Sequence, residues 1–181
     1  MPRLTDQQID TIKHNIADML TIRKYTITDT AQHDTNQIYM DFAHAQNEPL
    51  RVVLFLFPPE ILLPIDKILN ALAKNWQHVL MFVTSKAPTI GQIAKIPATT
   101  ELRVYNDFKI SPFTGPYSAH SDQIISFADI AGTHYNNIAD MPRMLLTDPV
   151  AIWLGAKSGD VIMSMVPTKA VPYRLVYRHV Y

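Results

Sequence analysis

The sequence predicts two domains, an α/β domain over residues 1–108 and a smaller α+β domain over residues 109–181. In the first, apolar runs of strand length alternate with stretches of helical spacing, which is the pattern of parallel strands joined by crossover helices. The composition then changes over residues 108–120, FKISPFTGPYSAH, where prolines and a glycine predict a linker. The elements after this linker are short and closely spaced, as in a compact second domain.

The first domain begins with an amphipathic helix. Thr5 or Asp6 can act as its N-cap, and Arg23 and Lys24 suit the negative end of its dipole. The apolar residues recur at spacings of three and four and predict one buried stripe, made of Ile9, Ile12, Ile16, Met19, Leu20 and Tyr25. After the helix, residues 26–37 are polar and predict a loop or a weak edge strand.

The rest of the first domain alternates strands with helices. Apolar runs predict strands at residues 38–43, 50–57, 79–84 and 101–105. The run at 50–57, LRVVLFLF, is continuous and therefore typical of a strand covered on both faces. Helical spacing predicts helices over 61–75 and over 89–96.

The stretch of the second domain with the clearest capping and turn signals is 141–162. Asp148 can accept hydrogen bonds from a new helical turn, Pro149 suits the first helical position, and Gly155 can end the helix in the left-handed conformation. Residues 157–160 have the composition of a tight turn, and the apolar run after them predicts a strand.

The flanks of this stretch carry weaker patterns. A helix is predicted over 127–132, a turn near Asn136 and Asn137, and helical residues over 142–146. The final residues, 171–181, predict a strand or one arm of a hairpin.

Composition excludes several classes of protein. The formal net charge is zero, so any nucleic-acid contact must come from a local patch or from a larger assembly. The chain contains no cysteine, which excludes disulfides, thiolate metal sites and a cysteine nucleophile. No apolar run is long enough to span a bilayer and no signal peptide is recognisable, so we expect an intracellular protein without a membrane partner.

Residues 148–161 resemble the signature of the RNA polymerase subunit-five family, whose archaeal member is the H subunit. That signature runs Asp-Pro-Val-Ala, two variable residues, Leu-Gly, a basic turn, Gly-Asp or Gly-Glu, and an apolar strand. Here it reads DPVAIWLGAKSGDV. Pro142-Arg143 upstream, and Pro167 and Tyr177-Arg178 downstream, match further positions of the family at the same distances.

The resemblance implies a non-catalytic structural subunit of a multi-subunit DNA-dependent RNA polymerase, with no cofactor and no metal. It implies that residues 109–181 form an assembly module like the archaeal H subunit, which docks on the largest polymerase subunit beside other subunits. Residues 1–108 are similar in element order to the family's jaw domain, a nuclease-like mixed sheet with helices. This implies a lower jaw in weak, non-specific contact with downstream double-stranded DNA.

The sequence also departs from the family. After Pro167, a glutamate of the family is replaced by Lys169 and a glycine by Pro172, which puts any contact made by that loop in doubt. Trp153 and the shortened jaw resemble versions encoded by large nucleocytoplasmic DNA viruses. The expected location is therefore the nucleus for a cellular protein, or the host cytoplasm and the virion for a viral one.

The matched positions are candidates for the subunit interface. They are Pro142, Arg143, Asp148, Pro149, Trp153, Leu154, Gly155, Gly159, Asp160, Pro167, Tyr177 and Arg178. Caps and turns alone would explain several of them, and Trp153 can equally belong to the core. The candidates for DNA proximity are Lys86, Pro88, Thr89, Lys95 and Arg103, for which an ordinary solvated surface is the alternative.

An alternative from another class is a Mg²⁺-dependent nuclease of the PD-(D/E)xK type. Asp107 and Lys109 follow the strand at 101–105, where the acid would hold the ion and the lysine would orient a water. Asp41 or Glu60 would supply a second acid. Asp-x-Lys is a common tripeptide, however, and neither histidines nor serines show catalytic spacing, so no catalytic residue is expected. A third possibility is a free-standing adaptor that uses the same module.

Overall fold

The computed structural model describes residues 4–34, 37–56, 79–84, 89, 91, 100–114, 121–130 and 135–181. The chain divides into two compact units, Met1–Lys109 and Ile110–Tyr181, close to the expected boundary after residue 108. In their described residues, both units combine a sheet with helices, so the fold is a mixed α/β fold with two sheets.

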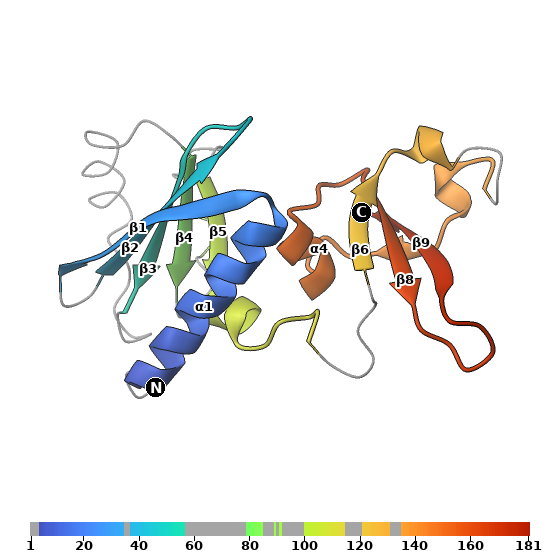
Figure 1. The fold of residues 1–181 in the computed structure, drawn as a ribbon. Helices are drawn as coiled ribbons and strands as arrows, with labels where there is room; N and C mark the ends of the chain where they lie inside the picture. The colour runs from blue at the N-terminus through green and yellow to red at the C-terminus, as the bar shows by residue number, and fades with distance from the viewer. Residues whose placement is uncertain are drawn as a thin grey trace. The chain divides into compact units, whose positions relative to one another are not determined.

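The first unit is built on a five-stranded mixed sheet in the order β1-β2-β3-β4-β5 (Figure 1). The strands are β1 (Tyr25–Asp34), β2 (Gln37–His44), β3 (Leu50–Phe55), β4 (Val79–Thr84) and β5 (Thr100–Val104). β1, β2 and β3 pair in antiparallel fashion, whereas β3, β4 and β5 are parallel. The strands predicted from the apolar runs are confirmed, and the polar segment after the first helix is the edge strand rather than a loop.

Helix α1 (Asp6–Ile22) lies on one face of this sheet (Figure 1). Its N-cap is Thr5, whose hydroxyl accepts from the backbone N–H of Gln8 while the Gln8 side chain accepts from the N–H of Thr5. The predicted stripe is confirmed at its centre, since the fully buried apolar residues are Ile12, Ile16, Met19 and Leu20. The side chain of Asn15 donates to the carbonyl of Phe108, 2.7 Å away, and ties the helix to the end of the unit.

The predicted helices at 61–75 and 89–96 lie outside the described residues, apart from Thr89 and Gly91. In the part of the chain that is described, no helix is long and apolar enough to cross a membrane. The described sheet and α1 share a core of aliphatic and aromatic side chains.

The second unit is built on a four-stranded sheet in the order β6-β8-β9-β7 (Figure 1). Its strands are β6 (Ser121–Ile125), β7 (Arg143–Met144), β8 (Val161–Val166) and β9 (Arg174–Val180), and its helices are η2 (Phe127–Asp129), η3 (Ile138–Asp140) and α4 (Pro149–Leu154). β8 and β9 form the predicted hairpin, with β6 antiparallel to β8 and β7 parallel to β9.

Two predictions for the second unit were wrong or incomplete, and one of its strands was not predicted. Residues 142–146 are not helical, because their backbone pairs with β9: the N–H of Tyr181 donates to the carbonyl of Met144, and that of Leu146 to the carbonyl of Tyr181. The helix predicted over 127–132 is only the single 3₁₀ turn η2 in its described part. β6 was not predicted, since its polar sequence SDQII becomes a strand only through its pairing with β8.

Candidate functional site

Helix α4 has the capping geometry that its sequence predicts. A carboxylate oxygen of Asp148 accepts from the N–H of Val150 at 2.9 Å, and Pro149 occupies the first turn. Gly155 ends the helix with a φ of 70°, a conformation that a side chain disfavours. The N–H of Ala156 then donates to the carbonyl of Ala151, which closes the C-terminus. Asp148, Pro149 and Gly155 therefore have structural roles before any partner is considered.

The turn after α4 is joined to the end of β9. A carboxylate oxygen of Asp160 accepts from the N–H of Lys157 at 2.7 Å, and Gly159 has a φ of 98°. The N–H of Gly159 donates to the carbonyl of Val180, and the N–H of Val180 donates to the carbonyl of Asp160. The Gly-Asp pair of the signature thus joins the turn after α4 to the end of β9 by backbone hydrogen bonds.

The two aromatic candidates pack inward to different degrees. Trp153 is only 1% exposed, and its ring makes an edge-to-face contact with Phe113 at 5.9 Å. Of the two roles that the sequence left open for Trp153, the structure supports the core. Tyr177 is half-buried and packs against the cluster of Ile130, Met141 and Val161. The remaining apolar candidate, Leu154, packs against the cluster that contains Ala151, Ile162 and Val180.

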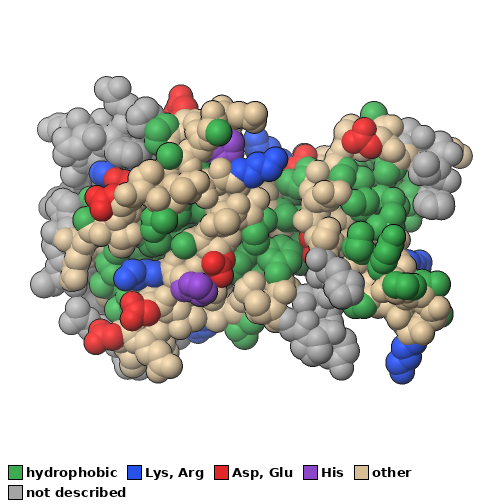
Figure 2. Space-filling view, in the orientation of Figure 1, with side chains coloured by type: hydrophobic (Ala, Val, Ile, Leu, Met, Phe, Trp, Pro, Cys, Tyr) green, Lys and Arg blue, Asp and Glu red, His purple; other side chains and the backbone are tan. Residues whose placement is uncertain are grey.

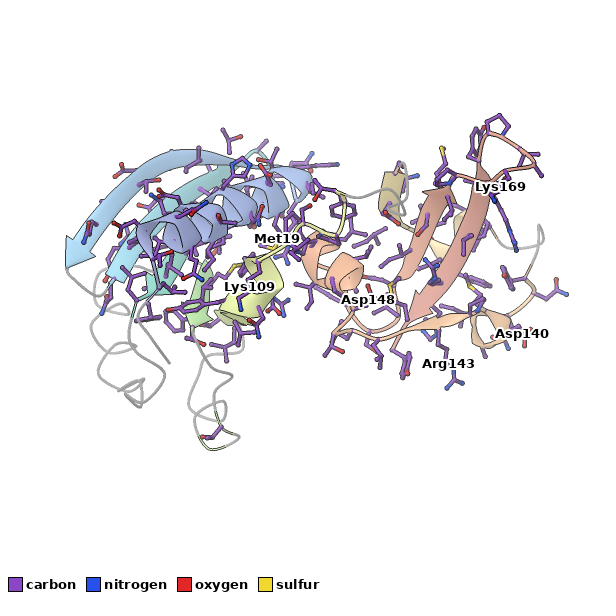
Figure 3. The ribbon with its side chains drawn as sticks, turned by 90° about the horizontal axis from the view of Figure 1, so that it is seen from below. Met19, Lys109, Asp140, Arg143, Asp148 and Lys169 are labelled. Atoms are coloured by element: carbon purple, nitrogen blue, oxygen red, sulfur yellow. The ribbon has the colours of Figure 1, made fainter. Side chains whose placement is uncertain are left out.

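Four of the matched positions meet around one open pocket of about 720 Å³. The pocket is formed by β7, the start of α4 and the end of β9, and Figure 3 shows Arg143 and Asp148 on the first two of these segments. Its lining residues are Arg143, Met144, Leu145, Thr147, Asp148, Pro149, Val150, Arg178 and Tyr181. The fold thereby brings together Arg143, Asp148, Pro149 and Arg178, which the sequence places in three separate segments.

The rim of this pocket combines apolar side chains with two guanidinium groups. Leu145 is 54% exposed, and Tyr181 is also exposed. Leu146, next to Leu145 in the chain, is exposed but does not line the pocket. The Arg143 guanidinium lies 5.8 Å from the centre of the Tyr181 ring, and Arg178 donates to the hydroxyl of the buried Ser164 at 3.3 Å. Exposed aromatic and aliphatic side chains beside arginine are typical of a protein–protein interface.

Sequence reasoning missed Leu145, Leu146 and Tyr181. The signal was present in part, because an apolar pair separated from a helix cap only by Thr147 and an aromatic residue directly after a strand both suggest a partner surface. Pro142 is exposed and Pro167 is half-buried at the start of the β8–β9 turn, and neither lines the pocket.

The candidates for DNA proximity are only partly described. Lys86, Pro88 and Lys95 lie outside the described residues, and Thr89 is exposed. Arg103 forms a salt bridge with Glu101, which also accepts two hydrogen bonds from the Arg23 guanidinium at 2.7 and 3.0 Å. Burial alone would raise the pKa of Glu101, but the bonds and charges of Arg23 and Arg103 lower it below its usual value.

Asp107 and Lys109 do not have the arrangement that a nuclease of this type requires. Asp107 and Lys109 do not share a strand face, because Asp107 lies in the 3₁₀ turn η1 (Tyr105–Phe108) and its carboxylate accepts from the N–H of Val104. Asp41 is held by two hydrogen bonds of 2.7 Å from the Arg51 guanidinium, and Glu60 lies outside the described residues. Within the described ranges, no three acidic or histidine side chains are grouped to hold a metal ion.

Residues 129–180 match the family model described as RNA polymerase Rpb5, C-terminal domain. The matched range contains η3, β7, α4, β8 and β9, and all lining residues of the pocket except Tyr181. No curated protein matches the chain. The resemblance to the subunit-five family is thus confirmed for this part of the chain. Residues 129–180 are similar to the C-terminal domain of the RNA polymerase subunit Rpb5.

Proposed function

We propose that the protein is a non-catalytic structural subunit that docks on the largest subunit of a multi-subunit DNA-dependent RNA polymerase. The observation that carries the proposal is the open pocket of the second unit. Four signature residues from three separate segments line it, together with exposed apolar side chains that the unit itself does not cover. In this proposal the pocket rim is the contact surface, and other polymerase subunits are further partners.

The construction of the second unit suits a docking platform. The caps of α4 and the hydrogen bonds between the Gly159 turn and β9 fix the backbone around the pocket. A rigid surface loses little conformational entropy on binding, so more of the contact free energy remains as affinity. Leu145 and Tyr181 would supply buried apolar area, while Arg143 and Arg178 would set orientation.

Affinity purification of the tagged full chain tests this proposal. We expect the wild-type protein to recover the large polymerase subunits, and Leu145→Glu to lose them because a carboxylate enters the contact. Ile27→Glu is the matched control, since Ile27 is 47% exposed and lies in the other unit. A wild-type protein that purifies without polymerase subunits, or that binds only partners outside a polymerase, would overturn the proposal.

For the first unit, the proposal is a lower jaw near downstream DNA. Lys86, Pro88, Thr89, Lys95 and Arg103 are the proposed DNA-proximal residues. Arg103 lies on β5, the last strand in the order of the described sheet, and its side chain is partly exposed, which supports the proposal. Such contacts would involve phosphates and not bases. The protein would act in the nucleus of a cell, or in the host cytoplasm and virion of a virus.

The proposed DNA contact of the jaw is tested by measuring the affinity of the polymerase for DNA over a range of salt concentrations. If Lys86 and Lys95 contact phosphates in the polymerase, Lys86→Ala with Lys95→Ala should reduce the salt dependence by roughly one to two released counterions. Lys13→Ala is the control, because Lys13 pairs with Asp10 on α1. An unchanged slope in the double variant would remove these lysines from the DNA contact.

A further inference from the structure

The turn between β8 and β9 is held in one conformation by its own residues. The hydroxyl of Thr168 donates to the carbonyl of Val171 at 2.7 Å and accepts from the N–H of Val171 at 3.1 Å. Pro167 and Pro172 lie on either side of these two hydrogen bonds and restrict the backbone there. The turn is therefore preorganised, which reduces the entropy lost when a partner binds.

Three exposed apolar side chains, Val171, Tyr173 and Leu175, lie in the turn and at the start of β9 and form what we call the apolar strip. In the register of the hairpin, Met163 lies opposite Tyr177 and Met165 opposite Leu175, so these side chains share a face. The exposed fractions are 41% for Leu175, 51% for Tyr173 and 51% for Val171. Figure 2 shows hydrophobic side chains gathered over the hairpin region of the second unit.

This apolar strip differs from the pocket in its place on the sheet. Arg178 lines the pocket and lies opposite Ile162, which belongs to the cluster with Ala151 and Val180. Successive side chains on a strand point to opposite faces, so Leu175 and Tyr177 lie on the other face from Arg178. The hairpin strip is therefore a second surface, independent of the proposed docking pocket.

The charge around the strip is positive. From Val161 to Tyr181 the chain contains no aspartate or glutamate. Lys169 and Arg174 are exposed, and Figure 3 shows Lys169 in the turn at the end of the hairpin. Among the described residues, no carboxylate forms a salt bridge with either of them. A partner that covers the apolar strip must therefore also meet two cationic side chains.

We propose that the hairpin arm, Thr168–Leu175, binds an acidic and apolar segment of a partner protein. Carboxylates of the segment pair with Lys169 and Arg174, and its apolar side chains cover Val171, Tyr173 and Leu175. A nucleic acid fits less well, because phosphates would meet the cations but leave the aliphatic side chains of Val171 and Leu175 without apolar contacts. The proposal holds whether or not the pocket docks on a polymerase.

Site-specific photocrosslinking with the full chain tests the proposal. A photoreactive phenylalanine derivative replaces Tyr173 in cells that make the protein, and mass spectrometry identifies the crosslinked peptide. We expect a protein segment with net negative charge and apolar residues. The same derivative at Ile124, which is 40% exposed and lies opposite Ile162 on the other face, should not crosslink to that segment.

Charge reversal provides the second measurement. Lys169→Glu in the Tyr173 crosslinking background should lower the yield on the order of tenfold, since attraction becomes repulsion. Lys157→Glu is the matched control, because Lys157 is exposed in the same unit but lies in the turn after α4, and it should leave the yield unchanged. Crosslinking to nucleic acid, to a neutral or basic segment, or no more strongly than from Ile124 would overturn the proposal. An unchanged yield in Lys169→Glu would also overturn it.

Discussion

The two units use their arginines in different ways. In the first unit, Arg51 binds the carboxylate of Asp41, and Arg23 and Arg103 both bind that of Glu101. In the second unit, no salt bridge joins Arg143, Arg174 or Arg178 to a carboxylate among the described residues. Arg143 instead lies over the ring of Tyr181, and Arg178 donates to a serine hydroxyl.

This difference distinguishes arginines that stabilise the fold from arginines that are available to a binding partner. A guanidinium removed from water must be paired, so the paired arginines of the first unit connect α1, β2, β3 and β5. An exposed arginine next to apolar side chains has its hydrogen-bonding capacity available to a partner. The comparison indicates that the first unit uses its charges for internal connections, while the second unit presents them at the pocket rim and the hairpin arm.

The largest expected effect comes from removing the carboxylate that two arginines share. Glu101→Gln should lower the free energy of unfolding by about 2 kcal/mol, because the largely buried Arg23 and Arg103 would both lose the carboxylate that binds them. Urea denaturation measures the change. Asp18→Asn, which affects only an exposed pair with His14 on α1, should change the free energy by less than about 0.5 kcal/mol. Equal effects of the two variants would refute the structural role of Glu101.

Removing one arginine from each unit should change the free energy of unfolding by different amounts. Arg51→Ala should cost about 1.5 kcal/mol, because Asp41 would lose both hydrogen bonds from the guanidinium. Arg143→Ala should stay within about 0.5 kcal/mol, since Arg143 is exposed. Thermal and urea unfolding of both variants provide the measurement. A larger loss in Arg143→Ala would mean that the second unit also uses its arginines for stability.

The helix cap is the next smaller effect. Asp148→Ala should lower the free energy of unfolding by about 1 kcal/mol, because the N–H of Val150 would lose its acceptor. Asp140→Ala in the exposed turn η3 is the control, with no comparable cap contact expected. If the two variants unfold alike, the capping role of Asp148 is disproved, and its place in the signature would have to come from partner contact alone.

The smallest effect is a pH dependence. The folded-state pKa of Glu101 lies below its usual value of 4.5, so this carboxylate contributes stability above that pH and loses it as the pH falls through the folded-state value. The difference in unfolding free energy between wild type and Glu101→Gln should therefore be complete above about pH 5 and shrink on further acidification. Urea unfolding of both proteins at a series of acidic pH values measures it. A difference that stays constant in acid would contradict the assigned charge interaction.

Several elements were predictable because their signals are local. The caps of α4, the left-handed Gly155 and the turn at Gly159 depend on neighbouring residues only, so the sequence predicted them correctly. Strands β3 and β4 were predictable because continuous apolar runs of that length belong inside a sheet. The resemblance to a polymerase subunit also rests on this local stretch, and the family match confirms it over residues 129–180.

The sequence by itself thus determined the capped helix α4 and the turn after it in the second unit, and the buried strands of the first unit. Only the tertiary structure decided that residues 143–146 run along β9, because their hydrogen-bond partners lie at the far end of the chain. It likewise placed Trp153 in the interior and assembled the pocket from three segments. The reason is physical: a cap needs one neighbour, whereas a surface for binding exists only after distant segments have met.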